Sequence, residues 1–397
     1  MMVHDGRPSA RSGRPDEART GTGTTVSAYD SRPIRRSIEV EYWVIDDEGR
    51  LVEPGDLVEV AAGTEREFVE PLLEIKTTPC ETTAELEAEL FDRLRRVLQR
   101  ADELGKGLVP LATPLTHEEI HELPSERTRI QNEVVGENFE YVRHCAGTHV
   151  HVEQQPGRAV DQFNTFVALD PALALVNSSP YFRGERLCAG ARSKLYRRMG
   201  YDDVPHQGWL WRYLDDVDEW DRRLERRYDE FVARAVEAGV DRRTVESSFD
   251  PESAVWTPVQ FREAFGTVEW RSPDTALPSQ AARLADTLAS TVDLLRTTET
   301  EVRIEGDTGR IHDGELVLPA FDSVLGYVEA AIDEGLDSDS LCAYLDRMGF
   351  DVDAFEPLSG EFDGRDRVSP VEARELRLRY ADRLAHDVRR SRVVRGD

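Results

Sequence analysis

The stretch Ser37-Ile-Glu-Val-Glu-Tyr-Trp-Val-Ile-Asp46 decides the fold of this chain. Its β-branched and aromatic residues favour a β-strand, in which successive side chains point to opposite faces. Glu39 and Glu41 lie together on one face, where two like charges 4 Å apart repel by roughly 4 kcal/mol at an effective dielectric of about 20. We therefore expect a positive group between these two carboxylates. The other face carries four apolar side chains: Ile38, Val40, Tyr42 and Val44.

The composition is that of a globular and strongly acidic protein. Hydrophobic residues make up 39% of the 397 residues, enough for one large domain with appendages or for two domains. There are 78 acidic and 50 basic residues, and the net charge of -28 argues against non-specific nucleic-acid binding, which needs a basic patch. The only lysines are Lys76, Lys106 and Lys194. An acidic surface with so little lysine indicates a halophilic protein, because high salt screens its self-repulsion.

Cysteine usage and hydropathy favour a cytoplasmic protein that does not enter a membrane. The four cysteines show no metal-binding spacing, which is typical of a reducing compartment. No apolar run approaches the ~20 residues that cross a bilayer. Residues 1–36 are rich in Arg, Gly, Ser and Thr and lack the apolar centre of a signal peptide. We expect this N-terminal segment to be disordered.

Hydrophobic periodicity along the rest of the chain predicts helices and strands in one α+β arrangement. Thr82 and Glu85 have the spacing of a capping box, and leucines follow them at helical spacing. Further helices are predicted over three ranges and throughout the chain from residue 279 onward: 127–143, 159–175 and 209–239. Further strands are predicted at five places: an edge strand ending near residue 60, the end of 67–79, 108–112, 147–152 and 266–273.

Four of the predicted strands each place two charged or metal-capable side chains opposite an apolar face. For any single pair, an exposed strand face is the simpler interpretation. If all four strands lie in one antiparallel or mixed sheet, helices pack on its apolar face and the other face forms a polar floor. The four pairs are Glu39/Glu41, Glu74/Lys76, His149/His151 and Glu269/Arg271.

Such a floor has the chemistry of a site for cations and phosphates. Carboxylate oxygens and one imidazole suit Mg²⁺ or Mn²⁺, and the lack of thiolates argues against structural zinc. Arginine and lysine beside metal-bound carboxylates favour a ligand with several negative charges, most simply a nucleotide triphosphate. The chain lacks the P-loop and GxGxxG patterns, so metals and side chains on a sheet would have to hold the nucleotide.

This arrangement resembles the glutamate–cysteine ligase type 2 family, carboxylate–amine ligases related in fold to glutamine synthetase. The resemblance covers roughly residues 37–277. It implies a glutamine-synthetase-type α+β catalytic domain over 37–300, with a mostly antiparallel sheet, and a helical C-terminal extension over 301–397 packed on it. Five motifs carry it in the family's order: Ile38-Glu-Val-Glu41, Phe68-Val-Glu-Pro-Leu-Leu-Glu74, Gly147-Thr-His-Val-His-Val152, Asn177-Ser-Ser-Pro-Tyr181 and Gly266-Thr-Val-Glu-Trp-Arg271.

The resemblance also implies an activity. Members use ATP to phosphorylate a γ-carboxylate, and an amine then attacks the acyl phosphate to form an amide. Glutamate and cysteine, giving γ-glutamylcysteine, are the first choice of substrates. Carried over by motif position, six residues would bind Mg²⁺ or Mn²⁺: Glu39, Glu41, Glu67, Glu74, His149 and Glu269.

The same resemblance assigns phosphate contacts to basic side chains. His151 and Arg271 would face the phosphates, and Arg271, beside Glu269, would stabilise the transferring group during catalysis. Lys76 belongs to the same ATP-binding set. Two residues of the arginine-rich segment after Pro180 would hold a substrate carboxylate or a phosphate: Arg192 and Lys194.

The chain departs from the family pattern at several positions, which leaves other functions open. Ser37 stands where glycine is usual, and Thr257-Pro258 stands where an Arg-Pro pair is usual, with Arg262 as a candidate substitute. Arg379-Tyr380-Ala381 matches the family's Arg-Tyr-Gly motif only in part. The alternatives are a catalytically silent homologue that binds a nucleotide or amino acid as a regulator, a γ-glutamyl ligase for another amine, and a metal-dependent hydrolase. The expected partners are small molecules, and a homo-oligomer stays open.

Overall fold

A central sheet of seven strands organises the computed structural model, which describes residues 32–202, 204, 206–296, 300–312, 314–362 and 364–390. The strand order is β2-β3-β1-β5-β9-β8, and β4 pairs with the end of β1 on the edge opposite β3, the same edge on which β5 pairs with the start of β1. Every pairing in this sheet is antiparallel. The strands are β1 Arg36–Asp46, β2 Thr64–Arg66, β3 Leu72–Lys76, β4 Lys106–Val109, β5 Thr148–Glu153, β8 Val259–Arg262 and β9 Thr267–Trp270.

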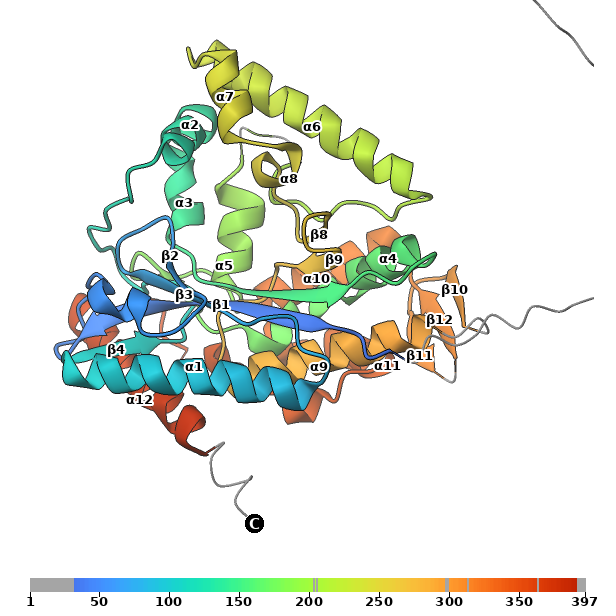
Figure 1. Cartoon of the computed structure of the whole chain (residues 1–397). Helices are drawn as coiled ribbons and strands as arrows, with labels where there is room; N and C mark the ends of the chain where they lie inside the picture. The colour runs from blue at the N-terminus through green and yellow to red at the C-terminus, as the bar shows by residue number, and fades with distance from the viewer. Residues whose placement is uncertain are drawn as a thin grey trace, which may run out of the picture.

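Strand β1 is the predicted strand Ser37–Asp46, and it holds the sheet together (Figure 1). Its first half pairs with β5, its middle with β3 and its last residues with β4. The apolar face predicted for it is fully buried, since Ile38, Val40, Tyr42 and Val44 are 0% exposed. The predicted antiparallel α+β sheet with one apolar face is confirmed.

Helices α1 Thr83–Glu103, α9 Pro278–Leu295 and α12 Pro370–Arg390 lie on the apolar side of the sheet (Figure 1). The predicted capping box begins α1, since the Thr82 side chain accepts from the Glu85 amide and the Glu85 carboxylate accepts from the Thr82 amide. The leucines of α1 are buried against the sheet. The Tyr42 hydroxyl donates to the Ala276 carbonyl at 3.1 Å just before α9, which joins β1 to this helical layer.

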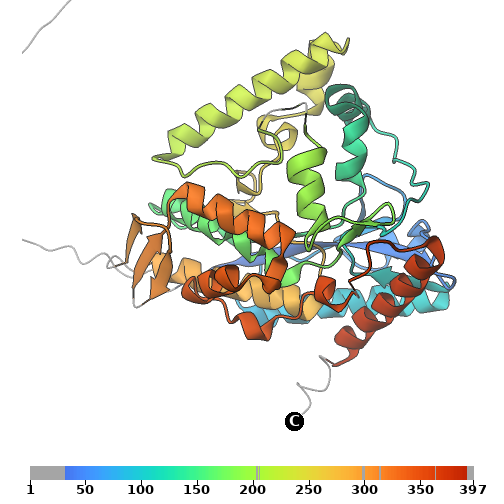
Figure 2. The same cartoon turned by 180° about the vertical axis from the view of Figure 1, so that it is seen from behind.

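A second group of helices stands over the opposite, polar side of the sheet (Figure 1). It comprises α2 Glu126–Val135, α3 Phe139–Arg143, α5 Ala191–Lys194, α6 Val217–Glu237, α7 Arg242–Ser248 and α8 Pro251–Ala254. Helix α5 continues into a π-helical turn, Leu195–Met199. Helices α2, α3, α6, α7 and α8 share a separate apolar cluster that includes Phe139 and Phe231. The polar face is therefore roofed by its own packed layer. The remaining helices, seen from behind in Figure 2, are α4 Ala159–Leu169, α10 Phe321–Asp333 and α11 Asp339–Arg347.

The structure corrects several predicted elements. The expected edge strand ending near residue 60 is wrong: a 3₁₀ helix, Gly55–Glu59, follows Pro54, and only an isolated bridge from Ile45 to Leu51 is strand-like. The predicted helix 159–175 changes at Asp170-Pro171 into a 3₁₀ segment, Asp170–Val176, because proline lacks the amide that continues an α-helix. The helix predicted from 209 begins at Val217, where the Asp216 side chain caps it.

The segment 301–397 was predicted to be helical, and this is only partly correct. It also holds a sheet in the order β10-β12-β11, formed by β10 Glu301–Ile304, β11 Arg310–His312 and β12 Glu315–Leu318. A further two-stranded sheet joins β6 Tyr181–Phe182 to β7 Glu185–Arg186. One apolar cluster contains residues from both predicted parts of the chain, such as Val40 and Val388. The extension thus packs on the central sheet, and a domain boundary at 300 stays a prediction.

Two expectations concern the chain as a whole. The N-terminal segment predicted to be disordered, 1–36, lies outside the described residues up to position 31, and Arg36 already belongs to β1. Among the described residues, no helix combines the length and the apolar character needed to cross a membrane.

Candidate active site

The register of the sheet brings the four predicted polar pairs onto one surface. Glu39 lies opposite both Lys76 of β3 and His149 of β5. Glu41 lies opposite Glu74. On the other side of β5, His151 lies opposite Glu269 of β9. Because directly opposed residues of antiparallel strands point to the same face, these side chains form one continuous polar floor.

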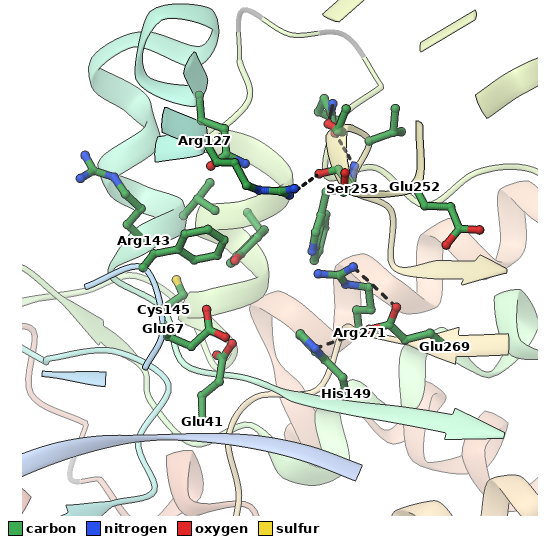
Figure 3. A pocket seen from close by; sticks show the side chains of 18 of the residues that line it. Glu41, Glu67, Arg127, Arg143, Cys145, His149, Glu252, Ser253, Glu269 and Arg271 are labelled. Carbon is green, nitrogen blue, oxygen red and sulfur yellow. Dashed lines mark hydrogen bonds and ion pairs between the residues drawn. The ribbon is translucent and has the colours of Figure 1, made fainter. Parts of the chain in front are cut away.

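Histidines and carboxylates alternate at the centre of this floor. The Nδ1 atom of His149 is 3.3 Å from Glu39 Oε2 and 3.5 Å from Glu269 Oε1. The Nε2 atom of His151 is 3.7 Å from Glu39 Oε1 and 3.6 Å from Glu269 Oε1. Figure 3 shows Glu269 between His149 and Arg271, whose Nη1 lies 3.6 Å from Glu269 Oε2. Glu269 therefore faces imidazoles on one side and a guanidinium on the other.

A second acidic group lies toward β3. Glu41, Glu67 and Glu74 each offer an oxygen within 4.8 Å of the others. Lys76 is their counter-charge, with Nζ 2.7 Å from Glu74 Oε2. The Gly147 amide donates to Glu41 Oε2 at 2.6 Å and so fixes one member of the group. Figure 3 shows Glu41 and Glu67 pointing toward one another. Lys76, whose Nζ also lies 3.9 Å from Glu39 Oε1, is thus the positive group that the sequence predicted near these carboxylates.

The donor set fits divalent cations. Three clusters have ligand atoms close enough to share an ion: Glu39/Glu74/His149, Glu39/His151/Glu269 and Glu41/Glu67/Glu74. Oxygen-rich clusters with one imidazole are ligands for Mg²⁺ or Mn²⁺. His151 Nε2 and Glu269 Oε2 are buried and have no hydrogen-bond partner among the described residues, as expected of atoms that can bind a further ligand.

The electrostatics of the floor also favour a cation. Burial and the charge of Glu41 raise the pKa of Glu67 to about 7. Burial, followed by the charges of Glu67 and other carboxylates, raises the pKa of Glu74 well above its usual range. Burial also raises the pKa of Glu39, but the neighbouring imidazoles of His149 and His151 outweigh this effect and hold that pKa far below the usual value. At the β3 end of the floor, Lys76 therefore offsets only part of the carboxylate charge in the metal-free protein.

A cavity of about 360 Å³ lies between the floor and the helical roof. Arg127 and Gln131 of α2 and Arg143 of α3 line it from above, with Tyr196 and Trp256 at its side. Figure 3 shows Arg127 held against the Ser253 segment, and its Nη1 donates to the Ser248 carbonyl at 2.9 Å. These roof residues could not be predicted from the sequence, because charged residues on a polar helix form no recognisable motif. The cavity can thus hold a ligand between an acidic floor and a basic, aromatic roof.

Two residues of the predicted site lie apart from the cavity. Arg192 is 2% exposed, and its Nη1 donates to the Ser272 carbonyl at 3.0 Å and to the Arg271 carbonyl at 3.3 Å. Its guanidinium occupies the space that a side chain at Gly147 would fill. Lys194 points away from the site and pairs with Asp333 at 3.3 Å. The other predicted residues all line the cavity: Glu39, Glu41, Glu67, Glu74, Lys76, His149, His151, Glu269 and Arg271.

Replacing Arg192 with Ala is expected to destabilise the protein by about 3 kcal/mol, because it leaves two buried carbonyls unsatisfied beside an empty space. Urea unfolding measures this change in free energy. Lys194→Ala is the control and should change it by less than about 0.5 kcal/mol, since Lys194 makes an exposed ion pair. Equal stability of Arg192→Ala and the wild type would contradict a supporting role for Arg192 in the strand end.

Comparison with known proteins agrees with this geometry. A model of glutamate–cysteine ligase family 2 matches residues 35–308. A Corynebacterium glutamicum protein, provisionally named glutamate–cysteine ligase 2, is 27% identical over 250 residues, which cover 59% of this chain and 62% of that relative. The match thus spans less than two thirds of the relative's length.

Solved structures share the fold at low sequence identity. A bifunctional glutathione synthetase from Pasteurella multocida has a TM-score of 0.54 at 13% identity, over 89% of this chain and 53% of that one. A glutamate–cysteine ligase from Francisella tularensis, solved with AMP, has a TM-score of 0.50 at 14% identity, over 93% and 96%. These likenesses agree with the predicted fold class. Since the family model matches more than half of this chain, the chain belongs to glutamate–cysteine ligase family 2.

Proposed function

We propose that this protein is an ATP- and Mg²⁺-dependent carboxylate–amine ligase, with glutamate and cysteine as its first-choice substrates. The observation that carries the proposal is the polar floor, where three potential cation clusters adjoin Arg271 inside one cavity. Membership of the family supports the reaction class. The four cysteines form no disulfide, which agrees with work in the reducing cytoplasm.

The floor residues would divide the chemistry among them. All three clusters would hold Mg²⁺ or Mn²⁺: the two that contain Glu39, and Glu41/Glu67/Glu74. Such cations neutralise phosphate charge during transfer. Arg271 would contact the phosphoryl group as it moves to the substrate γ-carboxylate. The roof would close the cavity, and excluding water there protects an acyl phosphate from hydrolysis before the amine attacks.

A direct assay tests the proposal. The full chain, in a high-KCl buffer that screens its net charge of -28, is incubated with ATP, MgCl₂, glutamate and cysteine. We expect equal amounts of ADP, phosphate and γ-glutamylcysteine, measured by enzyme-coupled assay and mass spectrometry. ADP release that needs glutamate and a different amine would reassign the second substrate. Nucleotide binding without ADP release from any amino acid pair would replace the ligase by a silent, ligand-binding homologue.

Metal binding is expected to weaken at least tenfold from pH 8 to pH 6. Glu67, with a pKa of about 7, is mostly protonated at pH 6, and a proton must leave before its carboxylate can bind a cation. Calorimetric titration of Mn²⁺ at the two pH values measures the affinity, and buffers of different ionisation heat count the protons released. Glu67→Gln should flatten this dependence. Equal affinity at both pH values would remove Glu67 from the ligand set.

A further inference from the structure

A second cavity, of about 540 Å³, lies between α6 and α10 and carries an unusual amount of positive charge. Figure 2 shows the yellow-green helix α6 above the orange helix α10. In a chain of net charge -28, this concentration of guanidinium groups is unexpected. Of the described residues that line it, Glu329 is the only acidic one. Six arginines line the cavity: Arg197, Arg198, Arg212, Arg223, Arg226 and Arg227.

These arginines differ in how firmly they are held. Arg197 is buried and bonded to Asp170, and Arg223 donates to the carbonyls of Arg212 and Tyr213, so both are structural. Arg226 has no ion-pair partner among the residues that the structure describes. Arg227 pairs with Glu230 on the surface, where such pairs contribute about 0–1 kcal/mol. Arg226 and Arg227 can therefore turn to an anionic ligand at little cost.

The cavity also offers an apolar and aromatic surface. Trp209 is 52% exposed, which is unusual for the largest side chain in proteins. Phe321 and Leu325 of α10 line the same cavity. The guanidinium of Arg212 lies 4.9 Å from the centre of the Phe321 ring. A flat apolar group can thus stack against these side chains while its charged end reaches the arginines of α6.

We propose that this second cavity is a binding site for a small organic phosphate that carries a flat ring. Several guanidinium groups around one cavity suit a phosphate dianion better than a single carboxylate, because each planar fork can hold two of its oxygens. The exposed indole of Trp209 supplies the stacking surface for the ring. The site is separate from the acidic floor and takes a ligand without metal ions.

The second cavity lies next to the first. Neighbouring residues line the two cavities: Tyr196 lines the first and Arg197 lines the second. The Nη2 atom of Arg197 also donates to Ser272 Oγ at 2.8 Å, directly after Arg271 in sequence. A ligand in the second cavity therefore contacts the wall of the first.

Calorimetric titration of the full chain with 1-naphthyl phosphate, in EDTA, tests the proposal. EDTA removes the cations that would draw a phosphate to the acidic floor, so binding in the first cavity is disfavoured. We expect one site, and binding at least tenfold tighter than that of inorganic phosphate or of 1-naphthol. The double variant Arg226→Gln/Arg227→Gln and the variant Trp209→Ala should each weaken it about tenfold or more.

Arg234→Gln is the matched control, because Arg234 lies on the same helix α6 but does not line the second cavity. It should bind 1-naphthyl phosphate like the wild type. Thermal melting of each variant checks that it is folded, and the exposed position of Arg226 makes loss of folding there unexpected. No binding by the folded wild type up to about 10 mM would overturn the proposal. The proposal would also be overturned if the double variant still bound 1-naphthyl phosphate and Lys76→Met did not, because the ligand would then lie in the first cavity.

Discussion

Replacing Glu74 with Gln is expected to lower ATP-dependent ligation by roughly 1,000-fold while the metal-free protein stays folded and gains stability at alkaline pH. Glu74 is 2% exposed and belongs to two of the three potential cation clusters. Glutamine keeps its shape but is a poor ligand for Mg²⁺. Glu74, which we propose as a cation ligand, is surrounded by the carboxylates of Glu67, Glu39 and Glu41, and their repulsion destabilises the metal-free fold when Glu74 is ionised.

The direction of the stability change follows from the raised pKa of Glu74. A carboxyl whose pKa is higher in the folded than in the unfolded state favours folding least at alkaline pH, because the unfolded chain ionises it freely. The contribution of Glu74 to the free energy of unfolding is fully present below the ordinary pKa of glutamate, near 4.5. It is lost as the pH rises through the raised pKa that Glu74 has in the folded state. Glutamine does not ionise. Glu74→Gln should therefore match the wild type at pH 4.5 and exceed it at pH 9.

Urea unfolding in EDTA at several pH values, with and without added MgCl₂, measures both effects of Glu74→Gln. Added MgCl₂ should stabilise the wild type and have little effect on the variant. Glu65→Gln is the matched control, since Glu65 also pairs with Lys76, at 3.1 Å, but lies on β2 outside the cavity. It should keep activity within about threefold. A Glu74→Gln variant that retains turnover would remove Glu74 from the cation site.

The sequence predicted the floor because its strands carry strong, local signals. In β1, charged and apolar residues alternate from Ile38 to Tyr42, so one register places both glutamates on a single face. The His149/His151 pair lies in the same kind of pattern, and a capping box located the start of α1. Each signal lies within a few residues, and such signals can be read without knowledge of the tertiary structure.

The features that were missed depend on distant contacts. Arg192 was predicted to hold a ligand, but it bonds to carbonyls of residues 271 and 272, some 80 positions away, and only the packed structure shows this. The roof arginines Arg127 and Arg143 come from polar helices whose inner face cannot be told from the sequence. The strands β10 to β12 are three or four residues long and charged, so their alternation is too brief to recognise.

Arg271→Lys is expected to lower kcat about 100-fold and to change the KM for ATP by less than about threefold. Lysine keeps the positive charge beside Glu269, so the buried carboxylate does not lose its partner. It lacks the planar fork that can bond two oxygens of a phosphoryl group at once. A loss confined to kcat would mean that Arg271 acts mainly in the transition state. Steady-state kinetics at saturating Mg²⁺ separate the two constants.

Arg262 provides the comparison, because it lies at the same 3.6 Å distance from Glu269 Oε2 as Arg271 does. Arg262 has a second carboxylate, Glu252, also at 3.6 Å, whereas Arg271 stacks on the Trp256 ring at 5.7 Å and has Glu269 as its ion-pair partner. If Glu269 binds a cation as proposed, Arg271 would lose its counter-charge and a phosphate could replace it, whereas Arg262 would keep Glu252. Arg262→Lys should therefore keep kcat within about threefold of the wild type. If Arg262→Lys proves the more damaging variant, the phosphoryl group passes on the Arg262 side of Glu269.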